Sequence, residues 1–135
     1  MNRLLPALAL ASLVVAVGAS QAATGRLVIR HQLHGCHTWS YNGNTYSASQ
    51  RIHLARGASL TIVDADVMPH TLVQQSGPHA VFGGPATMHM MNATLRVTFP
   101  KPGVYTFVTK AGEDYMPGMK TIGKDNVLRL TVTVA

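Results

Sequence analysis

Three observations predict an all-β sandwich for this chain of 135 residues. Segments such as 93–99, 104–109 and 127–134 alternate apolar and polar residues with the period of two that is typical of half-buried strands. Short turns rich in proline and glycine separate the apolar segments, and no stretch after residue 23 has a convincing helical period. Short strands joined by such turns are typical of a sandwich or barrel, so we expect one all-β domain with a single core.

The expected strands can be placed in chain order by their apolar residues. They are expected at 26–30, 46–54, 58–63, 71–75, 93–99, 104–109 and 127–134. The intervening segments read as loops, because they are rich in glycine, proline and polar residues. These loops are 31–44, 76–92 and 110–126. The sequence has no internal repeat and no low-complexity segment after residue 23, which agrees with one domain.

Residues 1–22 have the pattern of a secretory signal peptide. Arg3 supplies the basic start, residues 4–17 are apolar without charge, and Ser20-Gln21-Ala22 supplies small residues for cleavage. The apolar run is short for a membrane span, and no stop-transfer charges follow it. We therefore expect export to the periplasm or the cell exterior, with 23–135 as the mature domain.

The mature chain is expected to be basic and to contain one thiol. Without Arg3, ten Lys and Arg remain against five Asp and Glu, a net charge of +5 with neutral histidines. These basic residues are scattered singly and do not alternate with aromatic residues, so nucleic-acid binding is not expected. Cys36 is the only cysteine, which excludes an internal disulfide. Its thiol is therefore a ligand, a reactive group or an intermolecular bridge.

Three segments of the chain have the motifs of a known family. Residues 57–63 run into Asp66-Val67-Met68-Pro69-His70, residues 99–107 contain Pro-Gly-x-Tyr-x-Phe, and Met116-Pro117-Gly118-Met119 precedes the last expected strand. Together these segments resemble the cupredoxins, which are small exported copper proteins. They resemble, in turn, the family's strand, acidic turn and first histidine ligand, its hairpin and its last ligand segment. The resemblance extends from about Leu27 to Val134, and it implies a cupredoxin-like Greek-key sandwich.

The resemblance breaks in the last ligand loop. The family carries a cysteine and then a histidine there, whereas this chain has Thr109 and Asp114 at the corresponding positions, and only Met119 fits. The copper site has therefore either been lost or been rebuilt with ligands from another segment.

Strand direction favours a rebuilt site. The turn at Arg56-Gly57 marks one end of the sandwich, so His70 is expected at the opposite end. If the turn at 100–103 shares the first end, as the resemblance implies, the loops gather most soft donors around His70. That pole would hold His31, His34, Cys36, His37, His70, His79, His89 and most of the methionines.

A pole with thiolate, imidazole and thioether donors suits one copper ion, as Cu(I) or Cu(II). The expected ligands are Cys36, His37 and His70, with Met119 in the axial position. His34 is an alternative to His37, and Glu113 is an alternative to Met119. Residues 88–91, Met-His-Met-Met, are expected either to pack under a loop or to form a second, weak Cu(I) site.

Other residues near this pole are expected to have structural roles. Trp39 is expected to be a lid or an edge residue over the core rather than a part of the site. Asp64 and Asp66 are expected to form the turn before His70 by hydrogen-bonding their own backbone.

The predicted function is an exported copper-binding protein of cupredoxin type, acting as an electron carrier or as a copper carrier or buffer. Its expected partner is a redox or copper-transfer protein, and we expect a monomer, with a peripheral position at a membrane left open. No nucleophile–base motif is present, so we do not expect an enzyme. The alternative is a metal-free interaction module that kept the sandwich and lost the copper site.

Overall fold

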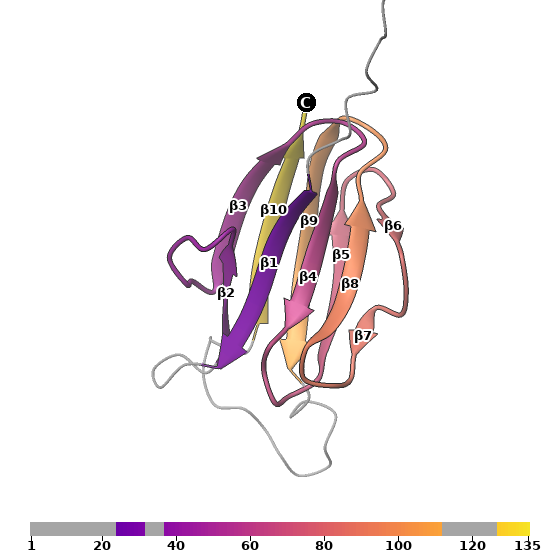
Figure 1. The fold of residues 1–135 in the computed structure, drawn as a ribbon. Coiled ribbons are helices and arrows are strands. Elements are labelled where there is room, and N and C mark those ends of the chain that lie inside the picture. Colours follow the sequence, from indigo (N-terminus) through magenta and orange to yellow (C-terminus); the bar gives the residue numbers. More distant parts are fainter. Residues whose placement is uncertain (1–23, 32–36, 112–126) are drawn as a thin grey trace, which may run out of the picture.

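The protein folds into two β-sheets that pack face to face (Figure 1). The structure is a computed structural model, and it describes residues 24–31, 37–111 and 127–135. Its strands are β1 (Thr24–His31), β2 (His37–Tyr41), β3 (Ser49–Leu54), β4 (Ser59–Asp64), β5 (His70–Ser76), β6 (Val81–Phe82), β7 (Thr87–Met88), β8 (Ala93–Thr98), β9 (Gly103–Ala111) and β10 (Val127–Val134). Within the described ranges there is no helix, and accordingly none that could span a membrane.

Each sheet has five strands and mixes parallel with antiparallel pairs. The first sheet has the order β2-β1-β4-β8-β6, and the second has the order β3-β10-β9-β5-β7. The pairs β1–β4 and β3–β10 are parallel, and the other pairs are antiparallel. The expected all-β sandwich is confirmed, and its arrangement is consistent with the cupredoxin-like architecture that the resemblance implied.

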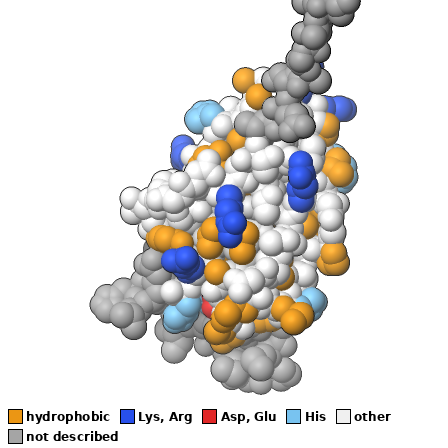
Figure 2. Space-filling model, viewed as in Figure 1, with side chains coloured by type: hydrophobic (Ala, Val, Ile, Leu, Met, Phe, Trp, Pro, Cys, Tyr) orange, Lys and Arg blue, Asp and Glu red, His pale blue; other side chains and the backbone are white. Residues whose placement is uncertain are grey.

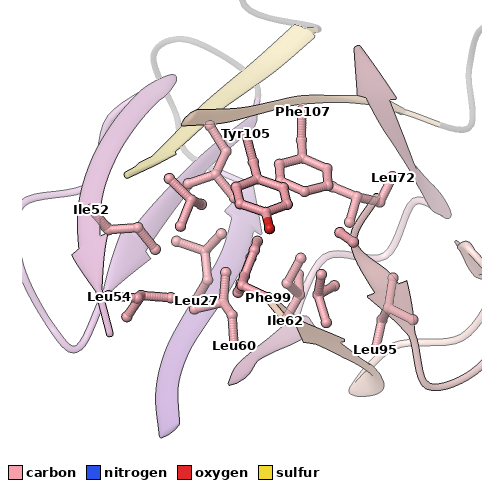
Figure 3. Packing of buried hydrophobic residues seen from close by; sticks show 14 of the residues in the cluster. Leu27, Ile52, Leu54, Leu60, Ile62, Leu72, Leu95, Phe99, Tyr105 and Phe107 are labelled. Atoms are coloured by element: carbon pink, nitrogen blue, oxygen red, sulfur yellow. The ribbon is translucent and has the colours of Figure 1, made fainter. Parts of the chain in front are cut away.

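The core lies between the sheets and is built by the alternating strands. In β10 every second residue is buried, from Leu128 to Val134. Figure 3 shows Tyr105 and Phe107 of β9 pointing toward Phe99. The Phe99 ring centroid lies 5.0 Å from that of Tyr105 and 6.1 Å from that of Phe107. Such edge-to-face contacts add to the burial energy of aromatic rings and fix their orientation.

Two segments that were expected to be loops contain strands. The strand β2 lies inside 31–44, and the short strands β6 and β7 lie inside 76–92. The first four residues of β2 are buried, so both of its faces are covered and no period of two marks it in the sequence. Trp39 lies in β2, the edge strand of its sheet, with none of its surface exposed, so it is an edge residue packed into the core and not a lid.

The two ends of the sandwich are defined by backbone hydrogen bonds. Gly57 N–H donates to the Phe99 carbonyl at 2.7 Å, so the β3–β4 and β8–β9 turns share one end, as expected. His70 begins β5 at the opposite end, and we call that end the histidine pole. Its described histidines and aspartates are His31, His37, Asp64, Asp66, His70 and His89, the last of which follows Met88, the register partner of His70. His79 does not belong to it. Because β5 runs away from His70, the next turn lies at the other end, where the Pro78 ring packs against Gly103.

Candidate metal centre

A short turn fixes the position of His70. β4 ends at Asp64, whose Oδ1 accepts a hydrogen bond from the Asp66 backbone N–H at 3.0 Å. Asp66 Oδ1 in turn accepts one from the Met68 N–H at 3.3 Å. Pro69 then restricts the backbone directly before His70. The two aspartates therefore form the turn, as expected from the sequence.

The other oxygen of Asp66 has a role that the sequence did not indicate. Asp66 Oδ2 lies 2.5 Å from His37 Nδ1 and 3.1 Å from His70 Nε2, and all three side chains are buried. An ionised carboxylate only accepts hydrogen bonds, so each of these ring nitrogens carries the proton. The carboxylate thereby joins β2 to the start of β5 at the histidine pole.

A third imidazole completes the cluster. His31 pairs with His37 in the β1–β2 register, and their ring centroids lie 5.7 Å apart. The His37 and His70 centroids lie 5.0 Å apart, with the rings nearly perpendicular. One donor atom from each of His31, His37 and Asp66 lies within 4.8 Å of the other two. His31 is exposed, so the cluster reaches from the interior to the surface.

The two buried carboxylates at this pole differ in their pKa values. Burial alone would raise the pKa of Asp66, but hydrogen bonds from His37 and His70 hold it well below its ordinary value. Burial raises the pKa of Asp64 from 3.8 to about 6, although the charge of His70 opposes that rise. Asp64 Oδ2 has no hydrogen-bond partner among the described residues. A buried acceptor without a partner raises the free energy of the folded state, so binding a proton or a cation at this pole would stabilise it.

The donor set fits a divalent transition-metal ion. Neutral imidazole and carboxylate are ligands for Zn(II) and Cu(II), and two buried carboxylates offset the charge of such an ion. Among the described residues, His31, His37 and Asp66 have donor atoms close enough together to hold it, and His70 contacts the same Asp66 carboxylate. These nitrogen and oxygen donors are harder ligands than the thiolate, imidazole and thioether donors expected from the sequence.

The predicted ligands fall into two groups. The structure brings His37 and His70 together, whereas Cys36, His34 and Met119 lie outside the described residues, as does the alternative ligand Glu113. These four residues therefore remain predictions as ligands. Thr109 corresponds to the cysteine of the cupredoxin motif, and its Oγ1 lies 3.4 Å from His70 Nδ1. At this position the chain has a hydroxyl, which is a poor ligand for copper.

Sequence reasoning missed Asp66 and undervalued His31 as candidate ligands. The signal that could have found Asp66 is its spacing, because it precedes His70 by four residues across a proline-stiffened turn. His31 was placed at this pole but was not among the expected ligands, because the strand β2 opposite it was not recognised.

The methionine segment, residues 88–91, has one buried methionine and two exposed ones. Met88 is buried in the core and pairs with His70 in the β5–β7 register. Met90 and Met91 are exposed, at 75% and 53%. The packing role is therefore confirmed for Met88, and a second copper site stays a prediction.

Comparisons with known proteins gave matches to solved structures alone. No family model matches the chain, and no curated protein matches it. A purple cupredoxin from Nitrosopumilus maritimus is 15% identical, with 82% of this chain and 98% of that chain covered and a TM-score of 0.46. A reduced amicyanin variant is 19% identical over 80% of each chain, with a TM-score of 0.36. The multicopper oxidase Fet3p, which functions in iron import, is 8% identical over 82% of this chain and 27% of its own, with a TM-score of 0.48.

Proposed function

We propose that this protein is an exported copper-binding protein of cupredoxin type that holds its ion at the histidine pole. The observation that supports this most directly is the buried Asp66 carboxylate between the His37 and His70 rings, with His31 within reach. Polar groups of this kind are rarely buried together without a ligand or a full set of partners, and Asp64 Oδ2 has no partner here.

In this proposal His37, His70 and Asp66 hold the ion, and His31 closes the site toward solvent. Cys36 or His34 and Met119 are the further donors expected from segments 32–36 and 112–126. Bound copper would supply reversible exchange between Cu(II) and Cu(I). The buried side chains bind the ion, fix its position and limit the access of water.

Burial of the described donors supports an electron carrier more than a copper buffer. His37, His70 and Asp66 are at most 1% exposed, and an ion held by such groups is released slowly. The exposed side chains of His31, Met90 and Met91 would instead suit a copper carrier or buffer, but they do not belong to the buried donors. We therefore propose an electron carrier that acts without enzymatic activity and passes its electron to a protein partner.

The direct test is a copper and zinc titration of the metal-free protein, with the retained metal measured by elemental analysis. We expect one retained copper ion, and loss of most of its affinity in His70→Ala and Asp66→Asn. His53→Ala is the matched control, because His53 is exposed on β3. An intense visible thiolate band with Cu(II) would identify Cys36 as a ligand. No retained copper, or equal losses in His70→Ala and His53→Ala, would refute the proposed centre.

One observation favours the metal-free interaction module. Asp66, His37 and His70 already satisfy one another by hydrogen bonds, and Thr109 stands where the cupredoxin motif has its cysteine. Under this alternative the cluster only stabilises the fold. Metal content would then stay at background, and the unfolding temperature would not change when copper is added.

A further inference from the structure

A hollow on the outer face of the first sheet is lined by two arginines. Its volume is about 460 Å³, and it lies over β1 and β4 beside the turn after β2. Arg26, Val28 and Arg30 point outward from β1, because they alternate with the buried residues of that strand. The rim carries the neutral polar side chains of Ser40, Asn42, Tyr46 and Asn92.

The two guanidinium groups have no acidic partner among the residues that the structure describes. Within those ranges the only side-chain carboxylates are Asp64 and Asp66, and both are buried at the histidine pole. Figure 2 shows several Lys and Arg side chains on the face over β1 and β4, and only a small spot of red near its lower end. Within the described ranges no carboxylate neutralises Arg26 or Arg30, so both guanidinium groups can take an acidic ligand.

The hollow is held in shape without a ligand. The Asn42 Oδ1 accepts a hydrogen bond from the Arg26 N–H at 2.9 Å, and the Asn42 N–H donates to the Arg26 carbonyl at 2.8 Å. The Arg30 guanidinium carbon lies 5.5 Å from the centroid of the Tyr46 ring, a cation–π contact that orients the group. A site whose side chains are already oriented loses less entropy on binding.

Guanidinium groups recognise carboxylates through paired hydrogen bonds, and the spacing here suits two carboxylates on one chain. Arg26 and Arg30 are four residues apart on an extended strand, so their Cα atoms are separated by about 13 Å. A single small carboxylate spans much less than this distance. Exposed Arg30 directly precedes His31, so a segment bound here would lie beside the candidate metal centre.

We infer that the Arg26–Arg30 hollow is the docking site for an acidic segment of a partner protein, which it binds through two carboxylates. The inference rests on charge and shape, and it holds whether or not the histidine pole binds copper. If the proposed electron carrier is correct, this site places the partner next to the ion.

The test measures binding of a fluorescein-labelled, glutamate-rich decapeptide by anisotropy at low and at physiological salt. The charge-reversed variant R26E/R30E should weaken binding at least tenfold. R51E/R129E is the matched control, because it changes the net charge equally on exposed positions of β3 and β10. This control should weaken binding less than threefold. In a nuclear magnetic resonance titration, the peptide should shift the backbone amides of 26–30, 42–46 and 63–65.

Three results would overturn the inference. Equal weakening by both variants would show that the peptide senses net charge alone. Arginine-dependent binding of a duplex oligonucleotide or of phosphatidylglycerol vesicles, without binding of the peptide, would assign the hollow to another partner. Full competition by free glutamate at millimolar concentration would assign it to a small anion. The variant R26Q/R30Q removes both charges without reversing them, and circular dichroism shows whether each variant is folded. Loss of binding is thereby distinguished from loss of folding, and none of these measurements depends on copper.

Discussion

Replacing Asp66 with asparagine should destabilise the metal-free protein by about 3–5 kcal/mol. Asp66 serves three donors, because Oδ2 accepts from His37 and His70 while Oδ1 accepts from the Met68 N–H. An amide has only one acceptor oxygen, so at least one buried donor loses its partner, at about 1–3 kcal/mol. The remaining bonds lose their charge assistance, at about 1 kcal/mol for each. Urea unfolding at pH 7 after chelator treatment measures the difference.

The neighbouring aspartate provides the control. In Asp64→Asn the oxygen that accepts from the Asp66 N–H is kept, and the group that is changed is Oδ2, which has no partner. Removing a buried charge without a partner should leave stability unchanged or raise it by about 1 kcal/mol. A loss below about 1 kcal/mol in Asp66→Asn, or equal losses in the two variants, would refute the assignment of the three hydrogen bonds to Asp66.

Three further predictions concern pH and the core. The raised pKa of Asp64 means that the folded state binds its proton more tightly, so its contribution to stability should fall as pH rises from about 4 to 6. Urea titrations across that range should show that the free energy of unfolding falls in the metal-free wild type relative to Asp64→Asn. Parallel pH dependences of the two proteins would contradict this prediction. Copper affinity should fall below about pH 6, because protons compete for imidazole and thiolate, and a competition titration that is flat from pH 7 to 5 would exclude such ligands. Phe107→Ala should cost about 3–5 kcal/mol in urea unfolding, whereas Val104→Ala, half exposed on the same strand, should change stability by less than about 1 kcal/mol.

The sequence predicted those parts of the fold whose signal is local. The last strand, 127–134, was placed to the residue because one face of it is buried and the other is only partly buried. The position of His70 followed from the proline before it and from the direction of β4. The strand β2 was missed because it is covered on both faces, and therefore lacks an alternating pattern.

The candidate site was harder to predict because it depends on contacts between distant segments. His37 and Asp66 are 29 residues apart, and only the β1–β2 and β1–β4 pairings bring them together. A turn-forming role was predicted for Asp66, which is correct for Oδ1 but does not account for the contacts of Oδ2. His79 was assigned to the wrong end because β6 and β7 were read as one long loop that returned to the histidine pole.

The parallel pairing of β3 with β10 has a consequence for how the chain acquires its structure. Within its sheet β3 pairs only with β10, which also forms the pair with β9. The second sheet therefore cannot close until the last strand of the domain has been synthesised. Such long-range pairing slows folding, to milliseconds or seconds in comparable β-proteins. A chain shortened before Val127 should remain unfolded, and a nascent chain should stay open until residues 127–134 have been synthesised.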